Sequence, residues 1–126
     1  MSVLVDSSAW VEYFRTGSNC EIIDFLIDEN LIVTNDIILA ELIPFLKIRK
    51  QNKLIRLLNN IKKIEITANW EQVIEFQTKC LRNGLNGVGI PDLLIAQNAK
   101  QNNSKIYSID KHFEFIKPFI KIHLFP

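Results

Sequence analysis

Several features that would place this chain in a specialised class are scarce or missing from its 126 residues. The two cysteines, Cys20 and Cys80, are too few for a disulfide framework or a cysteine-based zinc site, so we expect both to be small buried apolar residues. Four glycines and four prolines exclude collagen-like and low-complexity chains. The longest apolar stretch, residues 37–46, is interrupted by Glu41 and Pro44, and no run approaches the ~18 apolar residues of a membrane span.

The remaining composition is that of an ordinary globular domain. Hydrophobic residues make up 48% of the chain and charged residues 23%. A chain of this length buries roughly two-thirds of its unfolded surface, which is enough for one core without disulfides. The first residues have no basic segment, so we expect no signal peptide, and therefore a cytoplasmic protein. Because no repeat or linker interrupts the pattern, we expect one domain over residues 1–126.

Short β-rich runs alternate with longer stretches of helical periodicity along the whole chain. The expected strands lie at 3–5, 31–33, 64–66, 105–108 and 120–124. Pro44 falls inside an expected helix and should kink it, because proline removes one backbone donor. Strands that alternate with helices predict an α/β fold with a mostly parallel sheet. In such sheets ligands bind beyond the carboxyl ends of the strands, so that edge is where we look for chemistry.

Four acidic residues stand at positions that a solvated surface does not explain. Asp6 ends the first strand, and Asp110 follows the fourth. Glu41 has only apolar immediate neighbours, where a buried and unpaired carboxylate would cost several kcal/mol. Asp92 follows Pro91 in the first turn of an expected helix. Each has a structural alternative: a helix cap for Asp6 and Asp110, a favourable helix-dipole contact for Asp92, and an outward-facing side chain for Glu41.

Taken together, the four acids indicate a shared site. Asp6 and Asp110 fall at the same sheet edge if their strands are parallel neighbours. We expect the first turn of the helix that holds Asp92 on the opposite side, unless the glycine-rich segment 84–90 brings it round. Two carboxylates at ~5 Å repel by about 3 kcal/mol at an effective dielectric of ~20, so such a cluster needs protons or divalent cations. All-oxygen ligands favour Mg²⁺ or Mn²⁺, whose common use is phosphoryl-transfer chemistry.

A net charge of +1 hides an uneven distribution of the basic residues. Residues 42–64 contain no acid and hold seven of the 15 lysines and arginines. A polyanion lying across this surface would bring its phosphates to the acidic site, whereas the alternative is a solvated helix face. The residues expected to bind RNA are Lys47, Arg49, Lys50, Lys53 and Arg56.

Four motifs in register resemble a PIN domain and, more narrowly, a VapC-type toxin of a toxin–antitoxin pair. They are VLVDSSAW at 3–10, LAEL at 39–42, GIPDLLIA at 89–96 and IYSIDKHF at 106–113. The resemblance covers the whole chain. It implies a three-layer α/β/α fold with a mostly parallel five-stranded sheet of order 3-2-1-4-5. It also implies a Mg²⁺- or Mn²⁺-dependent endoribonuclease that is specific for single strands.

The resemblance also implies roles for individual residues. Asp6, Glu41, Asp92 and Asp110 match the family's catalytic acids. Asp6, Asp92 and Asp110 would bind the metal directly or through water, and Glu41 would orient the attacking water or complete the coordination shell.

Three polar residues near the acids, Ser7, Ser108 and His112, also bear on the resemblance. Ser7 and Ser108 match hydroxyl residues that support the acids. His112 stands where the family often has another acid, which leaves a second metal position open. We consider it either a general acid or a surface histidine.

The implied partners are an RNA substrate, a cognate antitoxin that fills the active-site groove, and a second copy of the chain in a homodimer. An exposed apolar patch would serve the protein contacts, with Trp10, Phe14, Phe45 and Leu46 as candidates, although core packing is the alternative for these side chains. No membrane partner is expected. The competing hypothesis is a catalytically inactive PIN-like module that binds RNA or protein. A phospho-acceptor regulatory domain is disfavoured because Asp6 has no acidic neighbour.

Overall fold

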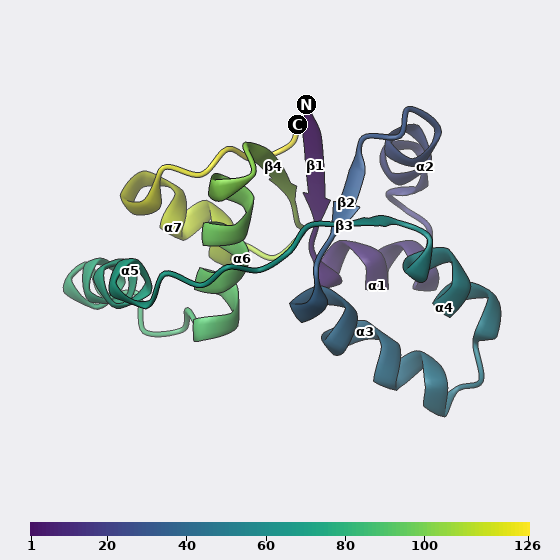
Figure 1. Ribbon diagram of the computed structural model, residues 1–126, viewed down its shortest axis with the longest axis horizontal. Helices are drawn as coiled ribbons and strands as arrows, with labels where there is room; N and C mark the ends of the chain where they lie inside the picture. The colour runs from purple at the N-terminus through teal and green to yellow at the C-terminus, as the bar shows by residue number, and fades with distance from the viewer.

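Four parallel strands form one sheet in the computed structural model, which describes residues 1–126 (Figure 1). The strands are β1 (Ser2–Val5), β2 (Ile32–Thr34), β3 (Lys62–Lys63) and β4 (Ser104–Tyr107), in the order β3-β2-β1-β4. In the central register, Leu4 pairs with Val33 on one side and with Ile106 on the other. The parallel sheet and its order from β3 to β4 confirm the prediction, and β3 lies just before the expected 64–66.

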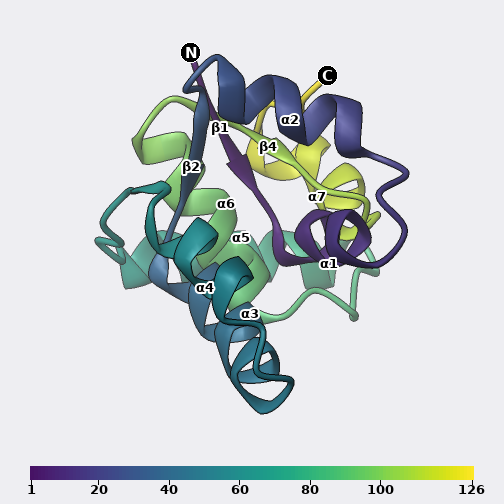
Figure 2. The ribbon, with the colours of Figure 1, turned by 90° about the vertical axis from the view of Figure 1, so that its right-hand side faces the viewer.

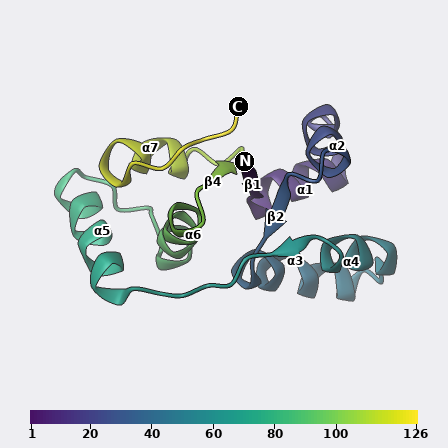
Figure 3. The ribbon, with the colours of Figure 1, turned by 45° about the horizontal axis from the view of Figure 1, so that its top comes forward.

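Helices cover both faces of the sheet and give the three layers that the resemblance implies (Figure 3). One face carries α1 (Ser7–Arg15), α2 (Cys20–Asp28), α3 (Asp36–Ile48) and α4 (Asn52–Asn59). The other carries α5 (Trp70–Arg82), α6 (Ile90–Gln101) and α7 (His112–Ile120). This division follows from right-handed crossovers, because the chain moves outward from β1 to β3 and then returns across β1 to β4. None of these helices combines the length and the apolar character that crossing a bilayer would require.

The expected fifth strand at 120–124 is reduced to one isolated bridge between Ile106 and Leu124. Helix α7 extends to Ile120, and Lys121 then adopts a left-handed backbone conformation with φ of 60° that ends the helix. Only Leu124 and its neighbours remain to pair with β4, where the Phe125 amide donates to the Ile106 carbonyl at 2.8 Å. The alternation of apolar and polar residues in this segment therefore predicted its position beside β4 but not its length.

The core corrects part of the expected apolar patch. Trp10 is completely buried and Leu46 is buried, so neither forms an exposed docking surface. Phe14 is half-buried and its ring stacks on Trp10, with centroids 5.6 Å apart, which leaves Phe45 as the one exposed member. Ala9 and Trp10 are the buried residues of α1, and Tyr13 and Phe14 pack against the same core, so the aromatic stripe of this helix faces inward.

The two cysteines differ in environment. Cys80 lies in the core of α5, as expected. Cys20, the first residue of α2, is exposed, so the prediction of burial was wrong there.

Buried amide side chains fix the segment that crosses from β3 to α5. Asn35 caps α3 by accepting from the Ile38 amide at 2.9 Å, and its side-chain amide donates to Asn98 Oδ1, also at 2.9 Å. Asn98 in turn donates to the Glu65 carbonyl at 3.0 Å. These bonds satisfy polar groups that would otherwise be buried without partners, and they hold α3 and α6 together below the carboxyl edge of the sheet.

Helices α3 and α4 form a hairpin that projects from the body of the molecule, which we call the α3–α4 arm (residues 36–59) (Figure 2). Helix α3 continues through Pro44 to Ile48. Phe45 and Ile48 are exposed on the outer half of α3, with exposed fractions of 60% and 81%. The base of the arm lies beside α1, and its tip extends away from the sheet.

Candidate active site

The four predicted acids come from four different elements that meet at the carboxyl edge of the sheet. Asp6 follows β1, and Asp110 lies in the loop after β4. Glu41 lies in the second turn of α3, which starts just beyond β2, and Asp92 in the first turn of α6. We refer to these four residues as the acidic cluster.

Asp92 reaches this edge without a detour. Helix α6 leads into β4 and runs antiparallel to the strands, so its first turn lies at their carboxyl ends. The expectation that it would lie on the opposite side was wrong, because a helix that delivers the chain to the start of a parallel strand must itself begin at the far end. Loop 84–89 is therefore not needed to carry Asp92 across the sheet.

Asp6 is the buried member of the cluster, with 5% of its surface exposed. Its Oδ2 accepts hydrogen bonds from Ser8 Oγ at 2.8 Å and from Ser108 Oγ at 3.0 Å. Asp6 is also the N-cap of α1, where it accepts from the Ser8 amide. The helix cap proposed as the structural alternative for Asp6 is thus confirmed. All of these bonds are made by Oδ2, so Oδ1 keeps no hydrogen-bond partner within the protein.

Ser108 and His112 link Asp6 to the other two aspartates. The Asp110 amide donates to Ser108 Oγ at 3.0 Å, so the hydroxyl that bonds Asp6 also shapes the loop that holds Asp110. The His112 amide donates to Asp110 Oδ1 at 2.9 Å. His112 Nδ1 lies 3.1 Å from Asp92 Oδ2 and 3.5 Å from Asp110 Oδ1. The imidazole therefore lies between two carboxylates of the cluster.

Electrostatic interactions connect Glu41 to the same cluster. Glu41 is exposed, as its structural alternative proposed, but its carboxylate still interacts with the cluster. Partial desolvation raises the pKa of Glu41, and the carboxylates of Asp6 and Asp92 raise it further. The Ser7 hydroxyl, as a hydrogen-bond donor, opposes this shift. Desolvation also raises the pKa of Asp92, with a smaller contribution from Asp6, while the contact with His112 opposes it. All four predicted acids therefore lie at one edge of the sheet.

The residues of the cluster fit a hard divalent cation by their chemistry. No lysine or arginine forms an ion pair with any of the four, and His112 is their one basic partner. Carboxylate oxygens are the ligands that Mg²⁺ and Mn²⁺ prefer. A cation would compensate the desolvation that mainly raises the pKa of Glu41 and Asp92, and it would also relieve the smaller repulsion between the acids. No three acidic, histidine or cysteine side chains yet surround a common point at metal-binding distance, so binding would draw them inward.

Two residues of the site have larger structural roles than the sequence predicted. The sequence indicated Ser7 and not Ser8 as a hydroxyl that supports the acids, yet the Ser8 hydroxyl bonds Asp6 and lies 3.0 Å from Ser108 Oγ, whereas Ser7 lies toward Glu41. His112 is half-buried between Asp92 and Asp110 rather than free on the surface. The available signal was the spacing, because each of these side chains stands two residues after an aspartate that ends a strand or follows one.

The five basic residues expected to bind RNA are all exposed on the α3–α4 arm: Lys47, Arg49, Lys50, Lys53 and Arg56. None forms an ion pair within the protein. The Arg49 guanidinium lies 4.7 Å from the centroid of the exposed Phe45 ring. Lys47 stands less than two helical turns beyond Glu41, so the basic surface begins close to the acidic cluster and continues outward.

The fold and the site together define a three-layer α/β/α domain with an acidic centre at the carboxyl edge of a parallel sheet. The sequence matches the PIN domain over residues 3–117, and the chain belongs to that family. A comparison with curated proteins gives no match.

Solved structures share this fold at low sequence identity. VapBC2 from Rickettsia felis, bound to a DNA fragment from its promoter, is 24% identical, with a TM-score of 0.78 over 99% of this chain and 98% of that one. VapBC-1 from nontypeable Haemophilus influenzae is 19% identical, with a TM-score of 0.75 over 99% and 97%. VapC20 of Mycobacterium tuberculosis, a Sarcin-Ricin loop cleaving toxin, is 15% identical, with a TM-score of 0.62 over 90% and 93%.

Proposed function

We propose that this protein is a metal-dependent, single-strand-specific endoribonuclease that acts as the toxin of a type II toxin–antitoxin pair. The observation that carries the proposal is the gathering of four carboxylates at one sheet edge, with no lysine or arginine to neutralise them. Carboxylates that lie this close repel one another and lower the stability of the fold, and such clusters are typical of catalytic sites that bind cations. Membership of the PIN family and the likeness to VapBC complexes and VapC20 support the toxin assignment.

The residues of the cluster divide into two roles in the proposed reaction. Asp6, Asp92 and Asp110 would hold Mg²⁺ or Mn²⁺, and the bound ion supplies charge stabilisation on the phosphate oxygens. Glu41 would orient the water that attacks phosphorus, and its raised pKa suits a group that accepts a proton from that water. Ser8 and Ser108 would hold the Asp6 carboxylate in one orientation. The bond between phosphorus and the 3′-oxygen would break, and the 3′-oxygen would take up a proton. One product would then carry a 5′-phosphate and the other a 3′-hydroxyl.

The partners of such a toxin are RNA, an antitoxin and a second copy of the chain. The exposed cations of the α3–α4 arm would bind the RNA backbone, and we propose that the protein acts in the cytoplasm, where RNA is present. Two of the similar solved structures are VapBC complexes, which supports a cognate antitoxin that covers the acidic cluster.

The face proposed for the homodimer is an apolar groove of about 280 Å³ on α5 and the start of α6. Trp70, Ile74, Leu81 and Ile90 line it and are exposed, and no charged residue does. Interfaces between permanently associated copies are more apolar than the rest of a protein surface, so this face fits a second copy better than a nucleic acid. The molar mass in solution at several concentrations tests the dimer, and Ile74→Asp should shift it toward one chain.

Cleavage of single-stranded RNA with purified protein tests the proposed function. Mg²⁺ or Mn²⁺ should support cleavage, and an excess of chelator should abolish it. Asp92→Asn keeps the size of the side chain and the contact partner of His112 but removes a metal-binding charge. We expect it to lose at least about 100-fold in rate with an unchanged circular dichroism spectrum. Near-native cleavage by this variant would overturn the assignment.

The alternative is a catalytically inactive PIN-like module that binds RNA or protein. It is favoured by one observation, namely that no three potential ligands already surround a common point. RNA binding that persists in chelator, with no cleavage at any metal concentration, would support this alternative.

A further inference from the structure

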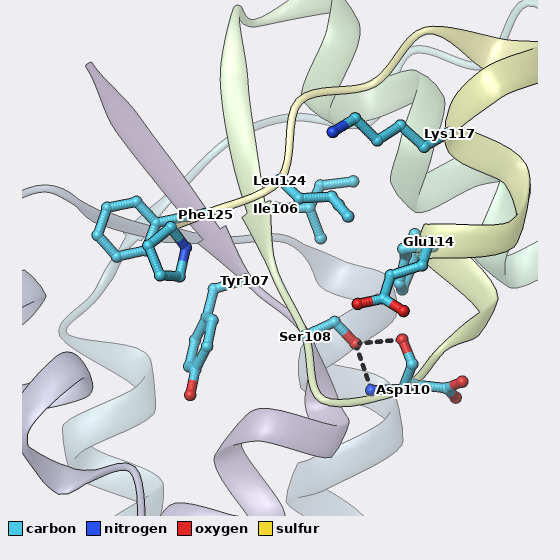
Figure 4. A pocket seen from close by; sticks show the side chains of 10 residues that line it. Ile106, Tyr107, Ser108, Asp110, Glu114, Lys117, Leu124 and Phe125 are labelled. Atoms are coloured by element: carbon cyan, nitrogen blue, oxygen red, sulfur yellow. Dashed lines mark hydrogen bonds between the residues drawn. The ribbon is translucent and has the colours of Figure 1, made fainter.

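A second hollow lies directly beside the acidic cluster. It has a volume of about 440 Å³ and lies between β4, α7 and the C-terminal segment (Figure 4). Ser108 and Asp110 line it and also belong to the site described above, so these two residues form a wall that the cavity shares with the acidic cluster. Pockets for small molecules span roughly 300–1,000 Å³, and this one is therefore large enough for one nucleotide but not for a folded segment.

The inner wall of this cavity is apolar and firmly held. Tyr107 and Phe125 form an edge-to-face pair with ring centroids 6.4 Å apart and planes at 85°. Ile106 and Leu124 lie beside them, where the bridge between β4 and the C-terminal segment fixes the backbone. Ile106 and Tyr107 are themselves buried, so the apolar surface open to a ligand comes from the half-buried Leu124 and Phe125. Such a surface suits one face of a planar ring and provides no partner for a phosphate.

The outer rim carries two opposite charges that have no partner in the protein. Glu114 and Lys117 both line the cavity from α7, three residues apart. In Figure 4 the Lys117 side chain reaches toward the C-terminal segment, whereas the Glu114 carboxylate is turned toward Ser108. Neither forms an ion pair, although this spacing would allow one, and both remain exposed. The rim therefore offers one acceptor with two oxygens and one cationic donor.

We propose that this cavity binds a guanine base of the RNA substrate beside the phosphate that is cleaved. The inference rests on the proposed ribonuclease function and adds a base preference to it. Guanine presents two adjacent N–H donors on its Watson–Crick edge, N1 and N2, which match the two oxygens of the Glu114 carboxylate. Its O6 acceptor matches the Lys117 amine, and its ring faces match the apolar wall. No other RNA base presents two adjacent donors on that edge.

The shared wall places the base next to the chemistry. Ser108 bonds Asp6 on one side and the Asp110 amide on the other, and it contributes to the cavity as well. A nucleotide whose base occupies the cavity would thus direct its backbone toward the acidic cluster. Glu114 and Lys117 would act as specificity-determining residues and take no part in the reaction itself.

Titration with the four nucleoside monophosphates in excess chelator tests the base site without cleavage. GMP, AMP, CMP and UMP share the same phosphate, so differences among them report the base alone. We expect GMP to shift the NMR signals of residues 106–108 and 124–125 and to bind about tenfold more tightly than UMP. Glu114→Gln replaces one acceptor by a donor and should weaken GMP binding at least about tenfold while leaving UMP unchanged.

Glu71→Gln is the matched control, because Glu71 is exposed in the first turn of α5 and does not line the cavity. It should bind GMP as the native protein does. Equal binding of all four nucleotides, equal binding of GMP by the Glu114 variant, or shifts outside the cavity would each overturn the proposal.

Cleavage of oligonucleotides that carry a single guanosine at successive positions separates this inference from the proposed function. Cleavage fixed at one distance from the guanosine, and lost from that position in Glu114→Gln, supports the base site. Metal-dependent cleavage without regard to guanosine would leave the ribonuclease intact and overturn the base site. GMP binding in the cavity without any RNA cleavage would overturn the ribonuclease instead.

Discussion

The acidic cluster and the α3–α4 arm carry opposite charges and are built in opposite ways. The acids stand on four elements, and Ser8, Ser108 and His112 connect the three aspartates, of which Asp6 is buried. The basic residues stand on one helical hairpin, all exposed, and none is paired with an acid. The aspartates of the cluster are thus held by shared hydrogen-bond partners, whereas the arm carries separate, unpaired charges.

This difference determines how each region should respond to change. In the cluster each carboxylate has a place that no other residue can fill, so single substitutions should have large and non-additive effects. In the arm each cation contributes to a summed potential, so single substitutions should have small effects that add. The α3 helix belongs to both regions, because Glu41 lies at its base and Lys47 less than two turns further along.

Asp6→Asn should have the largest effect on activity. The amide keeps an oxygen to accept from Ser8 and Ser108, so the cap of α1 survives, but the negative charge is lost. We expect the rate of RNA cleavage to fall by about 10³-fold or more, with a change of less than about 1 kcal/mol in the free energy of unfolding. Metal-activated cleavage and urea denaturation measure the two quantities. Glu75→Gln on the surface of α5 serves as the control, and a loss of activity matched by unfolding would contradict the prediction.

Ser8→Ala should lower the cleavage rate by about tenfold and more than Ser7→Ala does. Ser8 donates to Asp6 at 2.8 Å and is close to Ser108, whereas Ser7 acts on Glu41. A lost hydrogen bond to a charged group is worth about 1.5–3 kcal/mol at most, and water can replace part of it. Steady-state rates of the two alanine variants at saturating metal provide the measurement. A larger loss for Ser7→Ala would show that the support of Glu41 matters more than that of Asp6.

Neutralising two cations of the arm should change RNA affinity modestly and predictably. In the cleavage-deficient Asp6→Asn background, Lys50→Gln with Lys53→Gln should lower the slope of log affinity against log salt by about 1.4, because each contact to single-stranded RNA contributes about 0.7. Fluorescence anisotropy of a labelled oligonucleotide between low and high salt measures this slope. Lys79→Gln with Arg82→Gln on α5 is the matched control. An unchanged slope in the arm variant would mean that RNA does not contact these two lysines.

The sequence was sufficient to predict the fold class and a shared site for the four acids, for a physical reason. Apolar runs that end in aspartate predict strands with acids at one edge, and this held for Asp6 and Asp110. The expected position of Asp92 was wrong because the direction of α6 had been left out, and antiparallel return of the helix is a property of the whole crossover. The burial of Trp10 confirms core packing, the alternative role expected for this side chain, although its helical stripe alone does not specify how deeply neighbouring elements enclose it.

Hydrogen-bond partners were harder to predict than positions. Ser7 and Ser8 are adjacent and chemically identical, and only the geometry of the first turn of α1 decides which hydroxyl meets Asp6. His112 depends on the loop after β4, whose shape Ser108 fixes through the Asp110 amide. The predicted strand at 120–124 is only one bridge for a related reason. Helix α7 extends to Ile120 and leaves few residues to pair with β4, which the alternation of apolar and polar residues does not reveal.

Glu41→Gln should impair cleavage as the other cluster substitutions do, but its effect on folding should be small and opposite in sign, a gain in stability. Desolvation and the neighbouring acids raise the pKa of Glu41 in the folded protein above its ordinary value of 4.5, so folding favours the protonated form. Its contribution to stability is therefore greatest at low pH and is lost as the pH rises through the folded pKa. At neutral pH without metal, the neutral glutamine should raise Tm by about 2–4 °C, and this gain should vanish as the pH falls toward the ordinary value. Thermal unfolding in chelator across this pH range measures the difference in Tm.

Addition of Mn²⁺ should raise the Tm of the native protein more than that of the variant, because the ion neutralises the repulsion that the substitution has already removed. A lower Tm for the variant at neutral pH would show that the Glu41 carboxylate is stabilised rather than crowded by its surroundings.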